Sequence, residues 1–281
     1  MMVIPKKIHW CWLSGDPLPP RIQRCVDSWR KNMPDYEIVL WDMKRFDIHS
    51  VPFVEQACAA KKWAFAADYI RWYALYTEGG IYLDSDVKVY RRLDKFLQHQ
   101  AFSAVCYFHQ ATPEGTREEK YSLEAECIGS EKGHPLMKRC LDTYKNKNFR
   151  MTNGVVDMGV APVVLSNACM LYGWNNSKHV DKPLYLKEGI VVYPEKYFTF
   201  IAGEFSLRHT HTLHLAMNSW VSDFVYKQDI LLPLRKWHHY MMGRYWFFPR
   251  LHYKRKHLEK KVKRFLSHLK LLIFALNKRK S

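Results

Sequence analysis

Residues 63–87 read WAFAADYIRWYALYTEGGIYLDSDV, and this stretch decides the fold that the sequence predicts. A helix is expected over 61–77, because no breaker interrupts its apolar side chains before Gly79 and Gly80, which can take the left-handed geometry of a helix end. The run 81–83 is short and apolar, as in a buried strand of an α/β sheet. A helix that two glycines connect to such a strand indicates a βαβ unit.

The flanking segments continue this alternation. The N-terminal stretch VIPKKIHWCWLSGD predicts a strand with Ile8, Trp10 and Trp12 on one face. Further helices are expected over 19–34, after 135 and over 162–172, and further strands over 36–42, 101–108 and 189–193. Residues 110–120 read as a polar loop and the histidine-rich residues 208–220 as irregular. The order predicts an α/β fold with a mixed, mostly parallel sheet.

Charge is concentrated at one end of the chain. The net charge is +17, and residues 250–281 hold twelve Lys or Arg residues against the single acid Glu259. Apolar residues recur there at steps of three and four, which predicts an amphipathic helix with a lysine-rich back. We therefore expect two parts, a catalytic domain over 1–230 and an aromatic, basic helical tail over 231–281.

The seven cysteines are scattered and never form a CxxC pair, which indicates reduced thiols rather than disulfides or a zinc knuckle. No apolar run approaches the ~18 residues that span a bilayer. The N-terminus lacks the charged-then-apolar order of a signal peptide. These features predict a soluble protein of the cytoplasm.

Two carboxylates, Asp84 and Asp86, follow the strand at 81–83. If the strand continues through Asp86, both side chains point to one side, and a cation between them would remove their repulsion. Oxygen ligands suit Mg²⁺ or Mn²⁺. A solvated acidic turn is the alternative, since Asp and Ser favour turns. The buried strand favours the metal site, because α/β sheets bind ligands beyond the carboxyl ends of their strands.

Asp68 and Arg71 are almost the only polar residues of the preceding helix, and a spacing of three places them on one face. An ion pair on a wet surface would explain them. However, the helix is apolar nearly all round, which implies burial, and buried charges must be paired or face a polar cavity. The sequence therefore predicts a polar cavity beside this helix.

The pattern FAADYIRWYALYTEGGIYLDSDV resembles the signature of glycosyltransferase family 32, the DXD-containing sugar transferases. That family includes fungal Golgi mannosyltransferases and bacterial capsule and lipopolysaccharide enzymes. The segments IPKKIHWCWLSG, IGSEKGHP, YPEKYF and HLAMNSW are similar to further family motifs. The resemblance spans residues 3–220 and implies a GT-A fold and transfer of a sugar from a nucleotide-sugar donor with retention at the anomeric carbon.

The resemblance also implies roles for single residues. Asp86 would bind the metal directly, and Asp84 would contact the ribose or sugar, or the metal through water. Asp68 and Arg71 match the pair that holds the donor sugar, and Arg71, Asp84 and Asp86 form the implied catalytic set. The remaining matches are Trp12 stacked on the base, His214 as a further metal contact, and Ser219 with Trp220 closing over the diphosphate. Trp12 as ordinary core, and His214 as a polar residue near a turn, stay open.

Three other function classes compete with this one. A phosphatase with an aspartyl nucleophile also opens on Asp-x-Asp, but it needs Thr or Val where Lys88 stands, and no later GDxxxD segment follows. A zinc hydrolase would use His209, His211 and His214, although no carboxylate base lies at a diagnostic spacing. A nucleic-acid binder would explain the charge, but no recognised nucleic-acid motif is present.

The basic tail with its upstream aromatic residues fits an anionic membrane surface better than nucleic acid, with a merely solvated end as the alternative. The sequence thus predicts a metal-dependent, retaining hexosyltransferase with Mn²⁺ or Mg²⁺. Its expected donor is a UDP-sugar, and its expected acceptor is a glycan or lipid-linked oligosaccharide of capsule, O-antigen or lipopolysaccharide synthesis. The expected location is the inner face of the plasma membrane.

Overall fold

The computed structural model describes residues 3–111, 117–152, 155–156, 160–175, 180–200, 206 and 208–215. The chain divides into two units, Met1–Ser222 and Asp223–Ser281, and every described residue belongs to the first. The predicted tail lies outside the described residues, so the division into 1–230 and 231–281 stays a prediction. No helix among the described residues is long and apolar enough to cross a bilayer.

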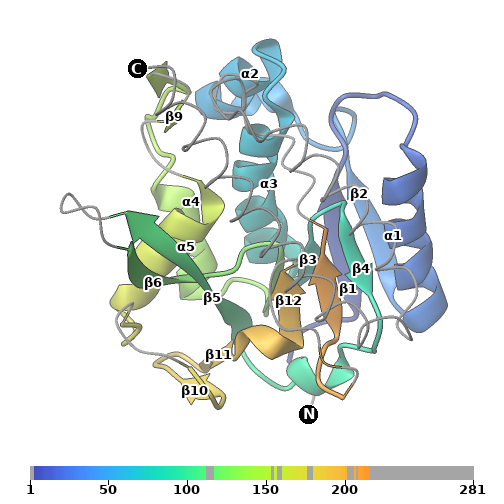
Figure 1. Cartoon of the computed structure of the whole chain (residues 1–281). Coiled ribbons are helices and arrows are strands. Elements are labelled where there is room, and N and C mark those ends of the chain that lie inside the picture. Colours follow the sequence, from blue (N-terminus) through green and yellow to red (C-terminus); the bar gives the residue numbers. More distant parts are fainter. Residues whose placement is uncertain are drawn as a thin grey trace, which may run out of the picture. The chain divides into compact units, whose positions relative to one another are not determined.

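The helices and strands alternate through the first half of this unit (Figure 1). Its helices are α1 (Pro20–Asn32), α2 (Pro52–Ala59), α3 (Trp63–Glu78), α4 (Pro135–Asp142) and α5 (Ala161–Met170). Short 3₁₀ turns are η1 (Ile48–Ser50), η2 (Asp94–Phe96) and η3 (Glu195–Tyr197). The strands are β1 (Lys7–Cys11), β2 (Glu37–Trp41), β3 (Gly80–Leu83), β4 (Val87–Val89), β5 (Ala101–Ala111), β6 (Arg117–Leu123), β7 (Cys127–Ser130), β8 (Met151–Thr152), β9 (Val155–Val156), β10 (Leu184–Tyr185), β11 (Ile190–Tyr193), β12 (Phe198–Phe200) and β13 (Thr212–His214).

The main sheet has the strand order β10-β11-β5-β7-β3-β1-β2, with β6 paired to β5. Strands β1, β2 and β3 are parallel to one another, β7 runs against β3 and β5, and β11 runs with β5. Five of the seven strands in this order therefore point one way, and only β7 and β10 are reversed. The predicted α/β fold with a mixed, mostly parallel sheet is confirmed.

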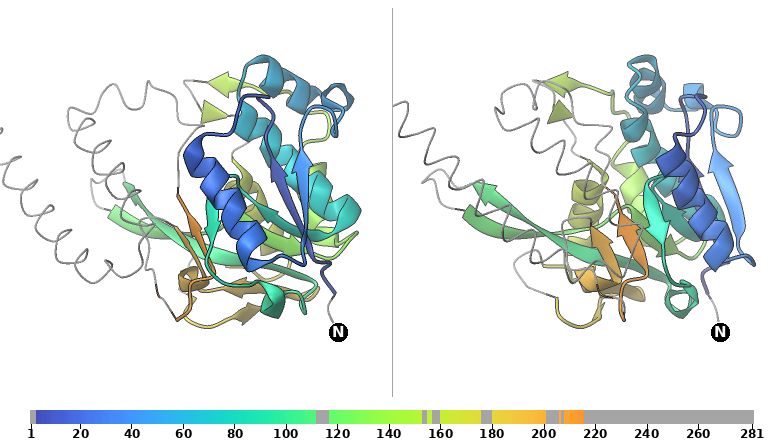
Figure 2. Two further views of the ribbon diagram at one scale, coloured as in Figure 1. Left: turned by 90° about the vertical axis from the view of Figure 1, so that its right-hand side faces the viewer. Right: turned by 45° about the vertical axis from the view of Figure 1, so that its right-hand side comes forward.

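The two faces of the sheet carry separate hydrophobic cores. Helix α1 packs through Val26 and Trp29 on the face that Ile8 and Trp10 of β1 share. Helices α2, α3, α4 and α5 pack on the opposite face, as the two views of Figure 2 show. Trp12 packs against the same core as Ile8 and Trp10, so the predicted common face of these three side chains is confirmed.

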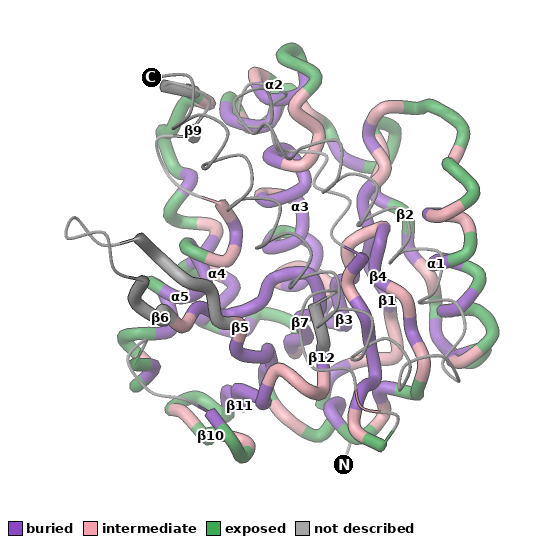
Figure 3. Tube along the Cα trace, viewed as in Figure 1, coloured by how far each residue is buried: buried purple, intermediate pink, exposed green. Residues whose placement is uncertain are grey.

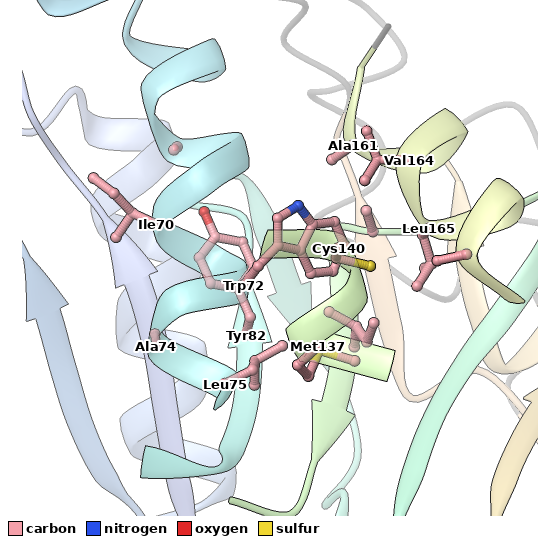
Figure 4. Packing of buried hydrophobic residues seen from close by; sticks show 14 of the residues in the cluster. Ile70, Trp72, Ala74, Leu75, Tyr82, Met137, Cys140, Ala161, Val164 and Leu165 are labelled. Carbon is pink, nitrogen blue, oxygen red and sulfur yellow. The ribbon is translucent and has the colours of Figure 1, made fainter. Parts of the chain in front are cut away.

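Helix α3 is largely buried, and Tyr73 is its one exposed residue (Figure 3). Figure 4 shows its Trp72 and Leu75 beside Met137 of α4 and Leu165 of α5. The helix stops where the sequence predicted, because Gly79 has a φ of +70° and its N–H donates to the Leu75 carbonyl. A side chain is excluded at Gly79, since an added Cβ would lie 2.7 Å from the Lys132 nitrogen.

Strands β5 and β7 meet at a glycine. Gly129 pairs directly with Phe102, and a Cβ added at Gly129 would lie 2.1 Å from the Phe102 ring. Phe102 is buried and occupies the space that a side chain at position 129 would need. The two strands can therefore approach at this point only because residue 129 has no side chain.

The structure corrects two sequence-based predictions about secondary structure. The polar loop expected over 110–120 is partly strand, because β5 continues to Ala111 and β6 begins at Arg117 as its antiparallel partner. The histidine-rich stretch expected to be irregular contains β13, which pairs with β4 and β12. Both segments are polar, and backbone pairing needs no apolar side chains, so hydropathy does not reveal them.

Candidate active site

A cavity of about 570 Å³ lies where β1 and β3 end. Trp12 and Leu13 follow β1, and Asp84, Ser85 and Asp86 follow β3. Helix α3 contributes Asp68 and Arg71, and the segment between β6 and β7 contributes Glu124, Ala125 and Glu126. Cys106, Glu195 and His214 also line it. Ligands of α/β sheets bind at this kind of position, beyond the carboxyl ends of parallel strands.

The guanidinium of Arg71 joins three parts of this cavity. Its Nη2 donates to Asp68 Oδ1 at 2.9 Å and lies 3.2 Å from Asp84 Oδ1, while Nη1 donates to the Ala125 carbonyl at 2.7 Å. The group also lies over the Tyr82 ring, 4.6 Å from its centroid. Burial alone would lower the pKa of Arg71. Asp84 and the other groups around it outweigh burial and raise that pKa above its usual range, so the side chain stays charged.

Asp68 connects the cavity to the start of α5. Its Oδ2 accepts a hydrogen bond from the Ala161 N–H at 3.1 Å, which satisfies one unpaired donor of that helix. Burial raises the pKa of Asp68 to about 6, and Asp84 adds to this effect while Arg71 opposes it. The predicted buried pair of Asp68 and Arg71 beside a polar cavity is thus present in the structure, rather than a pair on a wet surface.

Asp84 and Asp86 reach the cavity by a different route from the one predicted. Strand β3 ends at Leu83, and the Val87 N–H donates to the Asp84 carbonyl at 2.9 Å, so the two aspartates belong to a turn between β3 and β4. The expectation that the strand continues through Asp86 is wrong. Both side chains nevertheless line the same cavity, because the turn folds back toward it.

His214 lies beside Asp86 because β13 pairs with β4 in a register that sets His214 against Val87. Its Nε2 is 3.2 Å from Asp86 Oδ1. Burial lowers the pKa of His214, but the Asp86 carboxylate outweighs burial and the pKa is raised to about 9. In this structure His214 is therefore an ion-pair partner of Asp86.

Trp12 is half-buried directly after β1. Its ring packs against the core on the α1 side and also lines the cavity. Its indole Nε1 donates to the Asp16 carbonyl at 2.7 Å, and this hydrogen bond ties the ring to the loop after β1. Ser219 and Trp220, expected to close over a diphosphate, lie outside the described residues.

The acidic segment between β6 and β7 was not predicted from the sequence. Glu124 and Glu126 both line the cavity, and both are buried. The sequence held one signal, since Glu-Ala-Glu repeats the spacing of Asp-Ser-Asp just before the strand CIGS. Without the knowledge that β7 pairs with β3, nothing in the sequence placed these acids beside Asp84.

A divalent cation is the cofactor that the Asp-Ser-Asp pattern implies. No group of three His, Cys, Asp or Glu side chains within the described ranges is arranged to hold a metal ion. The residues still fit Mg²⁺ or Mn²⁺, because such ions are commonly held by one or two carboxylates together with substrate phosphates and water. Asp84 and Asp86 supply that donor set from one turn that lines the cavity.

The histidines of the alternative zinc site have separate partners. His211 Nδ1 donates to the Arg92 carbonyl at 2.7 Å and its ring stacks on Tyr197, whereas His214 contacts Asp86. His209 also lies beside the Tyr197 ring. These contacts use the histidines in packing and ion pairing, so the described residues do not support a zinc hydrolase built on them.

Residues 19–103 match the family model described as the glycosyltransferase sugar-binding region containing DXD motif. The matched span contains Asp68, Arg71, Asp84 and Asp86, four of the residues that line the cavity. The resemblance predicted from the sequence is confirmed: residues 19–103 are similar to the DXD-containing glycosyltransferases, a family of transferase enzymes.

The similarity to individual proteins is low and covers only part of each chain. The chain is 33% identical over 138 residues to inositol phosphoceramide mannosyltransferase 3 of Schizosaccharomyces pombe, a match that covers 48% of this chain and 35% of the relative. It is 26% identical over 186 residues to mannosyl phosphorylinositol ceramide synthase CSH1 of Saccharomyces cerevisiae, covering 62% of this chain and 45% of that protein. The chain thus spans less than half the length of these curated relatives.

Among solved structures, the PaToxG glycosyltransferase is similar with a TM-score of 0.42 and 21% identity. The match covers 60% of this chain and 69% of that one.

Proposed function

We propose that this protein is a metal-dependent glycosyltransferase that moves a hexose from a nucleotide-sugar donor to a glycan acceptor. One observation carries the proposal: Asp84 and Asp86 line the same cavity as the buried pair of Asp68 and Arg71, within the span that matches the DXD family.

Asp84 and Asp86 would hold Mn²⁺ or Mg²⁺ together with the donor diphosphate. When bound, the cation supplies positive charge that neutralises the leaving diphosphate. Arg71 adds a second fixed cation close to Asp84. Asp68 would accept hydrogen bonds from sugar hydroxyls, and Trp12 would offer a ring in the cavity lining on which a base can stack.

Proton transfer needs no base from the protein in this proposal. An oxygen of the departing phosphate takes the proton of the attacking acceptor hydroxyl, which is compatible with retention at the anomeric carbon. The residues of this chain would hold the acceptor hydroxyl on the same face of the donor sugar as the departing phosphate and exclude water, and such positioning can supply much of the rate acceleration. A hydrolase that uses Asp84 or Asp86 as nucleophile remains the competing function.

Donor and acceptor are finer parts of the proposal. A UDP-sugar is the first donor to test, and GDP-mannose joins it because the relatives' names describe mannosyl transfer. We propose a glycan or lipid-linked oligosaccharide of capsule or lipopolysaccharide synthesis as acceptor. The relatives' names give inositol phosphoceramide as the acceptor to compare. We further propose that the enzyme works at an anionic membrane surface on the cytoplasmic side.

A donor panel tests this proposal. Purified protein is incubated with UDP-galactose, UDP-glucose and GDP-mannose in the presence of Mn²⁺, Mg²⁺ or EDTA, and released nucleotide is measured. We expect turnover of one donor that EDTA abolishes. Asp86→Ala should lower turnover by at least about 100-fold, since loss of one electrostatic stabiliser costs about that much.

Its control is thermal unfolding of the same Asp86→Ala protein, together with Asp27→Ala on the exposed surface of α1. Both variants should unfold cooperatively, and Asp27→Ala should turn over like the parent protein. An Asp86→Ala enzyme that stays active and indifferent to metal would contradict the proposed function.

A further inference from the structure

Glu126 is a buried carboxylate for which the donor site has no use. Its side chain is 3% exposed, and neither Oε1 nor Oε2 makes a hydrogen bond to any residue that the structure describes. A carboxylate taken out of water is costly unless something donates hydrogen bonds to it. Glu126 also lines the cavity, so a ligand in the cavity can reach it.

The neighbouring acids lie on the same wall. Glu124 is two residues away and also buried, and Glu195 reaches the cavity from η3, on the side of Cys106 in β5. Burial raises the pKa of the Cys106 thiol, and the carboxylates of Glu124 and Glu126 raise that pKa further, which places these side chains close together. The three glutamates are called the acidic wall below.

The acidic wall is held rigidly next to the donor site. The Asp84 N–H donates to the Glu126 carbonyl at 2.9 Å, since β3 and β7 pair at this edge. The Glu124 N–H donates to the Ala104 carbonyl at 2.8 Å, and the Glu124 carbonyl accepts from Ser103 Oγ at 2.6 Å. A group bound by these glutamates would therefore lie one strand away from Asp84.

The chemistry of the wall selects its ligand. Burial, followed by Glu124, raises the pKa of Glu126 well above its usual range, so this carboxyl group is protonated and can both donate and accept hydrogen bonds, as sugar hydroxyls do. An anionic ligand is disfavoured, because the cavity holds three more acids, Asp68, Asp84 and Asp86. Several hydroxyls on one uncharged molecule are what a neutral sugar offers.

We propose that Glu124, Glu126 and Glu195 form the subsite that receives the reacting sugar of a neutral glycan acceptor. This inference rests on the proposed glycosyltransferase function and assigns its acceptor side: hydroxyls of the acceptor sugar donate to the acidic wall, and the sugar is thereby oriented toward the donor near Asp84.

The first test compares transfer with donor hydrolysis. Glu126→Gln and Glu124→Gln keep the side-chain shape and replace one carboxyl oxygen with an amide nitrogen, and Glu55→Gln makes the same change on the exposed surface of α2. With methyl α-glucopyranoside as acceptor, we expect the ratio of transfer to hydrolysis to fall roughly 10- to 100-fold in the wall variants, because one or two hydrogen bonds to buried groups are lost. Glu55→Gln should keep the parent ratio.

The second test measures charge selectivity without turnover. Binding of methyl α-glucopyranoside and of methyl α-glucuronopyranoside is followed by ligand-observed NMR. The parent protein should bind the neutral sugar at least tenfold tighter than the glucuronide, and Glu124→Gln should narrow that preference. A merely structural glutamate would leave the preference unchanged.

The outcomes separate the two proposals. A protein that hydrolyses no donor, yet binds the neutral sugar with the expected preference, overturns the proposed function and supports the subsite. Folded wall variants that retain the parent transfer ratio and the parent selectivity overturn the subsite and leave the transferase proposal in place. A wall variant whose only change is a higher demand for Mn²⁺ assigns the wall to metal binding and also overturns the inference.

Discussion

Arg71 shows how much one side chain organises at this site. A single buried guanidinium contacts Asp68, Asp84 and the Ala125 carbonyl, which come from a helix, a turn and the segment before β7. Removal of one partner from a buried ion pair leaves the other charge without compensation, and this costs about 3–5 kcal/mol.

We therefore predict that Arg71→Met lowers the thermal unfolding temperature by roughly 10 °C, given about 2–4 °C per kcal/mol for a domain of this size. Differential scanning calorimetry measures the change. Arg71→Met combined with Asp68→Asn should recover part of the loss, because the stranded carboxylate is then neutral. An Arg71→Met protein as stable as its parent would contradict the central position of this guanidinium.

Residues that line the cavity could be predicted from the sequence where they are polar exceptions in an apolar segment. Asp68 and Arg71 stand out because the helix around them is apolar, and Asp84 and Asp86 stand out at the end of an apolar strand. Glu124 and Glu126 do not stand out in this way, because no long apolar segment surrounds them. Their position depends on the pairing of β7 with β3, a contact between segments more than forty residues apart, which local pattern does not encode.

At the scale of elements, the short strand β13 matters most. It carries His211 and His214 in or next to its three residues and joins β4 to β12. Elements α1, α3, α5, β2 and β11 were predicted to within a few residues and α4 was predicted to begin after 135, since their apolar patterns are strong. Strand β13 was missed because its histidines and threonines give no periodic signal.

His211 makes this strand sensitive to acid. It is 6% exposed, its Nδ1–H donates to the Arg92 carbonyl, and burial together with Lys95 lowers its pKa to about 4. A depressed histidine pKa adds stability that is fully present above pH 6.5 and is lost as the pH falls toward 4.

We predict that the free energy of unfolding falls by up to about 3 kcal/mol more in the parent protein than in His211→Asn between pH 7 and pH 4. Urea titrations at several pH values measure it. Because other groups titrate in both proteins, the difference between the two curves reports His211. Parallel curves would show that the buried imidazole does not sense pH.

At the scale of the whole molecule, the sheet separates a small core under α1 from a larger one under α2, α3, α4 and α5. The cavity lies at the edge of this sheet, where β1 and β3 end. The basic tail was predicted from its composition and its apolar spacing, and it lies outside the residues that the structure describes.

We predict that the full chain floats with vesicles that contain phosphatidylglycerol and that a chain without residues 250–281 does not. The twelve basic residues of this segment would be attracted to the anionic surface, an effect that raised salt screens. Vesicle flotation measures it, with neutral phosphatidylcholine vesicles as control. Equal flotation of both chains would remove the membrane role of the tail.

The contact of Gly129 with Phe102 carries a consequence for sequence divergence. Because the Phe102 ring fills the volume beside residue 129, a mutation to alanine there is tolerable only after position 102 has become smaller. The two sites are thus expected to covary among descendants of this gene, with the smaller residue at 102 arising first.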